Sequence, residues 1–172
     1  MTPGTLKAQL NKRSGFASAH EEAYLNLMRT AAMLAGPEIA FFRSLDPSLS
    51  PASYNLLRIL RGHRDRAGDP DAHRGVRASE IGARMVVRTP DVTRLVDRLQ
   101  RHGLARRTRC PTDRRVVLVD ITERGAALLE QIDDRAHAIV RAQLDHLSHD
   151  ELRTLSRLLE KARNEDAPDA NH

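Results

Sequence analysis

Hydrophobic residues recur three or four positions apart over most of the chain, which is the spacing of one face of an α-helix. This pattern predicts a first long helix over residues 18–45, although a Gly36-Pro37 pair interrupts it and requires either a bend or two shorter helices. A second helix is expected over residues 51–61, with Ser50 as its N-cap. Residues 1–17 are polar and contain glycine, so we expect a mobile segment there.

The pattern changes in the middle of the chain. Residues 62–75 lack apolar periodicity and combine glycine, Asp-Pro and alternating charge, which predicts a loop. A short helical element follows the loop, and Ser79 is placed to cap it. Thr89 is a suitable N-cap and Pro90 a suitable first residue for the next helix, which ends at Gly103. The apolar stripe of that helix consists of Val92, Leu95, Val96 and Leu99.

Two short β-strands with a highly charged turn between them come next. The first begins at Leu104, and a β-branched run over residues 116–121 predicts the second. Helical spacing then returns and continues in two long patterns. Ser148 and Glu151 form a capping box that starts the last of these helices. We therefore expect a mainly α fold of the α+β type, in which a helix-turn-helix and its β-hairpin wing are flanked by helices.

Positive charge is concentrated in one segment of the chain. The net charge is +5 over 172 residues, yet residues 84–115 contain ten arginines and three aspartates, a net of +7. From residue 116 to the end, seven basic and twelve acidic residues give a net of −5. A compact basic segment in an otherwise balanced chain indicates a polyanionic partner for that segment.

The basic segment coincides with the helix-turn-helix and the hairpin, and this combination suits double-stranded DNA. A B-form major groove admits one α-helix, whose first turn faces base edges, while Arg98 and Arg101, further along the helix, are expected to meet phosphates. Arginines at a hairpin tip suit the negative potential of a narrow minor groove, and Asp113 is expected to hold one of their guanidinium groups. The candidate DNA-binding residues are Arg88, Thr89, Asp91, Thr93, Arg94, Arg98, Arg109, Asp113, Arg114 and Arg115.

The stretch "RASEIGARMVVRTPDVTRLVDRLQRHGLARRTRCPTDRRVVLVDITERGAALL" resembles the MarR (multiple antibiotic resistance regulator) family of winged-helix transcription factors. Three linked features carry the resemblance: the helix frame "TRLVDRL", the "HGLARR" that ends it, and the wing "DRR" followed by "ITERG". It covers residues 45–129 well, and the family's characteristic wing pair maps to Asp113 and Arg115. Two departures are the long loop at residues 62–75 and Arg77 at a position where a capping Thr is common.

The resemblance implies a homodimer that binds a pseudo-palindromic DNA operator, acts as a repressor, and responds to a small, often phenolic or aromatic, effector. On this basis Tyr24, Met28 and Tyr54 are candidate effector-binding residues, with ordinary core packing of all three as the alternative. The expected regions are a mobile segment at 1–17, an N-terminal dimerisation region at 18–48, a winged helix-turn-helix DNA-binding domain at 49–121, C-terminal dimerisation helices at 122–164 and a polar tail at 165–172.

Other classes of function find less support in the sequence. There is no phosphate-binding loop, nucleophile elbow or zinc-protease motif, so we expect neither an enzyme nor a cofactor. The eight histidines are too scattered to predict a metal site. Neighbouring arginines favour the thiolate of Cys110, the single cysteine, so a cysteine-based redox sensor stays an alternative, although a hairpin tip offers no pocket for it. An RNA-binding or scaffold module is a further alternative.

The same features suggest where the protein works. A single cysteine forms no intrachain disulfide, and no apolar run reaches the length of a signal peptide or a membrane span. We therefore expect a soluble, cytoplasmic protein without a membrane partner.

Overall fold

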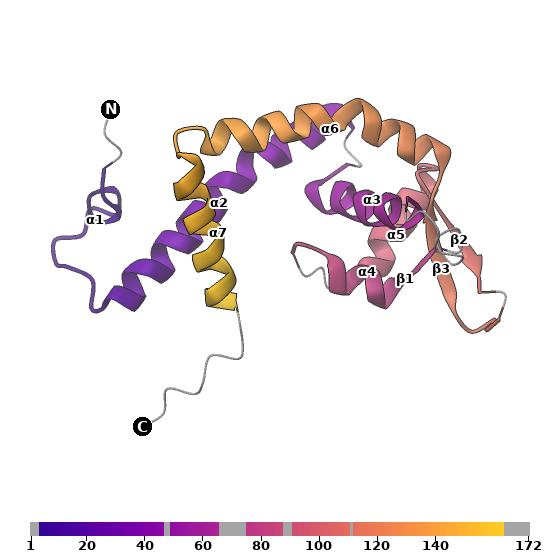
Figure 1. The fold of residues 1–172 in the computed structure, drawn as a ribbon, viewed down its shortest axis with the longest axis horizontal. Coiled ribbons are helices and arrows are strands. Elements are labelled where there is room, and N and C mark those ends of the chain that lie inside the picture. Colours follow the sequence, from indigo (N-terminus) through magenta and orange to yellow (C-terminus); the bar gives the residue numbers. More distant parts are fainter. Residues whose placement is uncertain (1–3, 47–48, 66–74, 88–90, 111, 164–172) are drawn as a thin grey trace, which may run out of the picture.

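The computed structural model describes residues 4–46, 49–65, 75–87, 91–110 and 112–163. In Figure 1 the long helices α2, α6 and α7 form an arm, and a smaller lobe that ends in the projecting β2–β3 hairpin lies beside one end of it. The elements in chain order are α1 (Leu6–Gln9), α2 (Ala19–Leu45), α3 (Pro51–Arg64), β1 (Val76–Arg77), α4 (Ala78–Arg84), α5 (Val92–Arg101), β2 (Ala105–Arg109), β3 (Val117–Ile121), α6 (Glu123–Leu144) and α7 (His149–Arg163).

The lobe is held together by one apolar core, which lies between α3, α4, α5 and the sheet. Leu57, Ile81 and Leu99, one from each of these helices, are at most 1% exposed, as is Val119 of β3. The core continues into the arm through Phe42 of α2 and through the first half of α6. Aliphatic residues from every element of the lobe therefore fix how α5 sits on the sheet.

The sheet is antiparallel, with strand order β1-β3-β2. In the β2–β3 hairpin Ala105 pairs with Ile121 and Arg109 with Val117. The two-residue strand β1 covers the other edge of β3 through Val76 and Val119. This arrangement confirms the helix-turn-helix with a small hairpin wing that the sequence predicts.

Several elements differ from the sequence-based expectation. Of the two alternatives for the first long helix, the one with two shorter helices is wrong, because residues 19–45 form one helix that continues through Pro37. The helix α3 runs to Arg64, three residues beyond the predicted end, and so includes His63, which the pattern places in a loop. A one-turn helix, α1, lies within the segment expected to be mobile, and its Leu6 is buried.

Two helices begin with an N-cap residue other than the one that the sequence predicts. The N-cap position of α4 is Arg77, which makes no capping hydrogen bond with its side chain, and Ser79 lies inside the helix. The predicted cap Thr89 and first helical residue Pro90 lie outside the described residues, and α5 begins at Val92 with Asp91 as its N-cap. By contrast, the predicted capping box at the start of α7 is present, since Ser148 and Glu151 exchange hydrogen bonds.

Gly103 ends α5 as predicted, and its backbone shows why a glycine is needed. Its φ of +68° lies in the left-handed region, where residues with a Cβ are disfavoured. The chain reverses there, and the amide of Leu104 donates to the carbonyl of Leu99 at 2.9 Å. The turn therefore leads the chain directly from α5 into β2, the first strand of the wing.

No helix among the described residues is both long and apolar enough to cross a membrane.

Candidate nucleic-acid interface

The first turn of α5 is organised by one carboxylate. Asp91 accepts a hydrogen bond from the backbone amide of Arg94 at 2.8 Å, and its second oxygen lies 3.5 Å from the Arg94 Nε. The Arg94 side chain is nevertheless 77% exposed. Asp91 thus both caps the helix and holds the stem of an arginine whose end groups stay open to solvent.

The two faces of α5 differ sharply. Leu95, Val96 and Leu99 are buried in the core, as their spacing predicts. Thr93, Arg94 and the neighbouring Asp91 are exposed at the start of the helix, and Arg101 is exposed at its end. The open face therefore offers a hydroxyl and a guanidinium in the first turn and positive charge further along. The predicted residues Arg88 and Thr89 lie outside the described residues.

Arg107 of β2 joins the wing to α5. Its Nη1 donates to the Gln100 side chain at 3.0 Å and to the Asp97 carboxylate. Its Nη2 donates to the backbone carbonyl of Thr93 at 3.2 Å. One guanidinium from the hairpin therefore contacts α5 near its start and again further along, which fixes the position of the helix relative to the wing.

The wing turn depends on Asp113, but differently from the sequence-based expectation. The Asp113 carboxylate accepts a hydrogen bond from the backbone amide of Arg115 at 2.9 Å, and its carbonyl accepts one from the amide of Val116 at 3.0 Å. The predicted guanidinium partner is absent among the described residues. Asp113 therefore shapes the backbone of the turn instead of holding an arginine side chain.

The arginines of the hairpin divide into two groups. Arg106 pairs with Asp120, which faces it across the ladder and is 5% exposed, with its Nη2 at 2.6 Å. Arg107 pairs with α5. Within the described part of the chain, no ion pair occupies the three remaining arginines, and all of them are exposed. These are Arg109, Arg114 and Arg115. The free positive charge of the wing therefore lies at its tip, while the arginines nearer its base hold the structure together.

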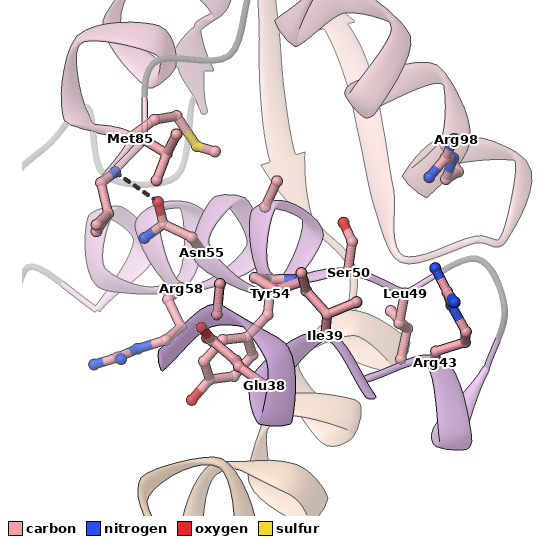
Figure 2. Close-up of a pocket in the computed structure, with 15 residues that line it drawn as sticks. Glu38, Ile39, Arg43, Leu49, Ser50, Tyr54, Asn55, Arg58, Met85 and Arg98 are labelled. Atoms are coloured by element: carbon pink, nitrogen blue, oxygen red, sulfur yellow. Dashed lines mark hydrogen bonds between the residues drawn. The ribbon is translucent and has the colours of Figure 1, made fainter. Parts of the chain in front are cut away.

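A cavity of about 640 Å³ lies beneath α5 between α2, α3 and the turn that joins α4 to α5. Tyr54 lines it, and Figure 2 shows Arg43 and Arg98 at one end of it and Arg58 at the other. Val86, in the turn, donates its amide to the Asn55 side chain at 2.9 Å, the bond that is drawn dashed in Figure 2. Arg98 of α5 and the turn that precedes α5 therefore both line the cavity.

The other two predicted effector residues lie elsewhere. Tyr24 and Met28 of α2 are 61% and 53% exposed and are not among the described residues that line this cavity. Within one chain neither residue packs in the core, whereas Tyr54, which is 6% exposed, does.

A hydrogen-bonded network ties the lobe to α6 beside the cavity. The Tyr54 hydroxyl donates to one oxygen of Asp133 at 2.7 Å, and Arg61 pairs with the other oxygen at 2.7 Å. Partial burial acts to raise the pKa of Asp133, but the bonds from Tyr54 and Arg61 outweigh it and lower that pKa. Burial, followed by the bond to Asp133, raises the pKa of Tyr54 to about 12.

The described residues contain no group of three or more His, Cys, Asp or Glu side chains placed to hold a metal ion.

Known proteins resemble both the sequence and the fold. Residues 71–117 match the model of the MarR family. The HTH-type transcriptional regulator YfiV of Bacillus subtilis strain 168 is 31% identical over 156 residues, which cover 87% of this chain and 90% of the relative. The crystal structure of a MarR transcription factor from Planctomyces limnophilus is 38% identical with a TM-score of 0.61, covering 86% of this chain and 99% of that one.

A second similar structure is that of Bordetella bronchiseptica BpsR, which is described with the regulation of its DNA binding by 6-hydroxynicotinic acid. It is 24% identical, has a TM-score of 0.69, and covers 88% of this chain and all of that one. At this identity the likeness concerns the fold.

A helix-turn-helix with a basic outer face, followed by an arginine-tipped hairpin on a small antiparallel sheet, defines a winged helix-turn-helix DNA-binding protein. Within that class the comparisons select one family. The chain belongs to the MarR family and is a transcriptional regulator, not an enzyme.

Proposed function

We propose that the protein is a homodimeric repressor that binds a pseudo-palindromic DNA operator and releases it when a small aromatic effector binds. The observation that carries this proposal is the placement of exposed positive charge on two neighbouring features of one lobe. The open face of α5 carries Arg94, and the wing tip carries Arg109, Arg114 and Arg115. A helix of this kind fits the major groove, and such a tip fits the adjacent minor groove.

Each feature has its own role in the proposal. Thr93 and Arg94, in the first turn of α5, contact base edges, with Asp91 holding Arg94 in place. Arg101, further along the helix, contacts phosphate. The wing arginines read the width of the minor groove and add affinity for any sequence. Arg88 and Thr89 remain candidates from the sequence alone.

Dimerisation is supported by the apolar surface of the arm. Eight large hydrophobic residues are exposed on the three arm helices, although a single chain has nothing to cover them. They are Tyr24, Leu27, Met28, Met33 and Ile39 of α2, Val140 of α6, and Leu155 and Leu158 of α7. Exposed apolar residues on all three of these helices fit a self-complementary interface with a second copy of the chain. We therefore assign residues 18–48 and 122–164 to dimerisation and residues 49–121 to DNA binding.

The cavity beside Tyr54 is the proposed effector site. Apolar walls from Ile39, Leu49 and Met85 suit an aromatic ring, and the arginines at its ends suit a carboxylate or phenolate. Because Arg98 belongs to α5, an effector that draws its guanidinium inward also moves the helix that reads DNA. The protein responds to such a ligand because the ligand binds more tightly when α5 is in one of two positions relative to the rest of the lobe.

The DNA-binding and dimer parts of the proposal are tested together. Binding to short palindromes from the region upstream of the protein's own coding sequence is measured in competition with random duplex DNA and with structured RNA. We expect strong discrimination in favour of one palindrome, and light scattering at micromolar concentration should give twice the 19.3 kDa mass of one chain. Equal binding to the structured RNA would support the RNA-binding alternative, and a fully helical monomer would contradict the dimer.

The effector site is tested with 4-hydroxybenzoate as the probe and 4-hydroxybenzyl alcohol as its uncharged counterpart. We expect the acid to weaken operator binding at lower concentration than the alcohol, and Arg43→Ala to remove that difference while leaving operator affinity without ligand unchanged. Arg29→Ala, an exposed change on α2 outside the described cavity lining, is the matched control. Equal effects of acid and alcohol in the wild type would contradict an anion-binding effector site.

A further inference from the structure

A second, smaller cavity of about 250 Å³ lies between the end of α3, β1 and the wing. Cys110 directly follows β2, is only partly exposed and lines this cavity, so the expectation that a hairpin tip offers it no pocket is wrong. Thr112 of the wing turn and Leu118 of β3 line it as well. No described lining residue is shared with the larger cavity beside Tyr54, so the two cavities are separate.

One polar side chain in the small cavity lacks the partners that a buried polar group normally has. His63 of α3 is 9% exposed, and neither of its ring nitrogens has a hydrogen-bond partner among the described residues. A neutral imidazole carries one donor and one acceptor, and burying both without partners is costly. An imidazole in this state that lines a cavity indicates a ligand that supplies the missing partner.

The charged residues of the cavity favour an anion as that ligand. Arg77 is exposed, its side chain makes no capping bond to α4, and no ion pair within the described part of the chain occupies it. Glu80 also lines the cavity, but its carboxylate pairs with Arg84, which offsets the negative charge. A guanidinium of this kind suits a carboxylate, because its planar fork can donate two parallel hydrogen bonds.

The wing adds a further donor, and the size of the cavity limits the ligand. The Thr112 hydroxyl lies 3.1 Å from the Cys110 Sγ, its neighbour in the cavity. Polar groups from three separate segments therefore surround the cavity, while Leu118 offers an apolar surface. Since this cavity has less than half the volume of the one beside α5, it suits a molecule of a few heavy atoms instead of an aromatic acid.

We propose that the small cavity binds an aliphatic carboxylate of about the size of propionate, without a covalent bond and separately from the aromatic effector. One carboxylate oxygen accepts a hydrogen bond from the Arg77 guanidinium. The other accepts from the His63 imidazole and from the Thr112 hydroxyl. The short alkyl chain lies against Leu118. The imidazole thereby gains a partner that it lacks in the empty protein.

The site has a consequence for DNA binding that rests on the proposed function. The bound carboxylate joins α3 and β1 to the wing turn, which is closed by the bond from the Cys110 amide to the carbonyl of Val116 at 2.9 Å. A ligand that bridges these segments restricts the wing before DNA arrives, so less conformational entropy is lost when the wing enters the minor groove. The carboxylate therefore strengthens operator binding, whereas the proposed aromatic effector weakens it.

Binding is tested without DNA, by following the imidazole NMR signals of the whole protein during a titration with sodium propionate at constant ionic strength. His63→Gln identifies the His63 signals among those of the eight histidines. We expect the His63 signals to shift with a saturable Kd of about 1–10 mM, and propionamide, which has a similar shape without the charge, to bind at least roughly tenfold more weakly. The absence of a saturable shift, or equal binding of acid and amide, would overturn the proposal.

The contribution of Arg77 is tested in the same titration. Arg77→Gln should weaken propionate binding roughly tenfold, to the level of propionamide. The fold tolerates this change because the side chain makes no capping bond. Arg29→Gln, at an exposed position on α2, and Arg43→Ala, in the larger cavity, are the controls and should leave the His63 titration unchanged. Full binding by Arg77→Gln would overturn the assignment of the carboxylate to this cavity, as would a loss of binding in Arg43→Ala.

Cys110 provides a check that binding is not covalent. The Thr112 side chain, followed by the backbone amides of Thr112 and Asp113, lowers the pKa of the Cys110 thiol. A thiolate would compete with the carboxylate for positive charge, so Cys110→Ser, which does not ionise near neutral pH, should bind propionate at least as tightly as the wild type. Weaker binding by the Ser variant would show that the thiol itself is required, and would overturn the proposed set of contacts.

Operator affinity separates this proposal from the proposed function. With saturating propionate, and with chloride adjusted to keep the ionic strength constant, operator DNA should bind roughly threefold more tightly, and Arg77→Gln should abolish that gain. A saturable shift of His63 with unchanged or weaker operator binding would overturn the regulatory consequence. If the protein without ligand shows no preference for any DNA, the proposed function fails instead, and the His63 titration still decides whether the site exists.

Discussion

At the scale of single residues, Asp133 shows how one side chain can join two parts of the molecule. It lies on α6, yet both of its oxygens are taken by side chains of α3, namely Tyr54 and Arg61. A hydrogen bond to a charged group is worth more than one between neutral groups. The contact between arm and lobe therefore depends on this carboxylate as well as on apolar packing.

Replacing Tyr54 with Phe should lower the free energy of unfolding by about 1.5–3 kcal/mol at neutral pH, because a bond to a charged acceptor is lost. The lowered pKa of Asp133 means that the network stabilises the folded protein above about pH 4 and less as the pH falls through the folded pKa. The raised pKa of Tyr54, about 12, means that the contribution is complete below about pH 10 and is lost as the pH rises toward 12.

Urea denaturation of both proteins across this pH range, at one protein concentration, measures the difference. Asp134→Asn, which changes an exposed carboxylate next to Asp133 on α6, should have almost no effect at neutral pH. Equal losses in the two variants, or a loss in Tyr54→Phe that does not vary with pH, would contradict the role of the network.

Asp113 is a second residue whose role follows from a single bond. Since its carboxylate accepts from the Arg115 amide, Asp113→Ala should loosen the wing turn and weaken binding to operator and random DNA alike. Asp113→Asn keeps an acceptor oxygen and removes the negative charge, so it should bind at least as tightly as the wild type. Fluorescence anisotropy with both DNAs measures the effect. Tighter binding by the Ala variant would show that the carboxylate only repels phosphate.

At the scale of elements, the start of α6 packs so closely against the start of the wing that there is no space for a side chain between them. A Cβ added at Gly125 would overlap the carbonyl oxygen of Leu104 and come within 2.8 Å of the Ile121 side chain. Glycine at this position therefore allows α6 to approach the sheet closely, which fixes the angle between arm and lobe.

Gly125→Ala should consequently destabilise the protein by about 1–3 kcal/mol, because backbone atoms must shift to admit the methyl group. Gly62→Ala is the matched control, since that glycine is also helical and has no heavy atom within 4 Å of the added Cβ. The control should be neutral or stabilising by up to about 1 kcal/mol. Thermal denaturation distinguishes the two, and a stabilising effect of Gly125→Ala would contradict the close packing described here.

The elements also show which features of the fold can be predicted from the sequence alone. The buried stripe of α5, the wing, and the capping box of α7 were predictable because each depends on residues within a few positions of one another. The burial of His63 was not, because it depends on α3 continuing past Gly62 and on contact with the wing.

The candidate site was predictable only in part for the same reason. The basic residues could be assigned to the correct elements from the sequence. The sequence did not distinguish the arginines that form ion pairs within the protein from those that stay exposed without one. Arg106 and Arg107 form ion pairs with Asp120 and Asp97, partners 14 and 10 positions away that only the folded hairpin brings near. An Arg facing an Asp across the predicted hairpin register is a signal that could have identified the first pair.

At the scale of the whole molecule, the proposed DNA-binding arginines and most of the exposed large hydrophobic residues lie on different parts. Figure 1 shows the wing projecting from the lobe, away from the free ends of the arm helices. The exposed arginines of the first turn of α5 and of the wing tip belong to the lobe, and most of the exposed large hydrophobic residues belong to the arm. A dimer formed through the arms presents two lobes, which requires operator half-sites about one helical turn, or a multiple of it, apart.

The central claim, that α5 reads sequence while the wing supplies charge, is tested most directly by a salt titration of operator binding. Arg94→Ala should cost roughly 1–3 kcal/mol per half-site and relax specificity at one base position. Arg115→Ala should weaken binding to operator and random DNA evenly, and should make the slope of log affinity against log salt shallower by about one unit per wing. Arg29→Ala, on the arm, should change neither quantity. Equal loss of sequence discrimination in Arg94→Ala and Arg115→Ala would contradict this division between helix and wing.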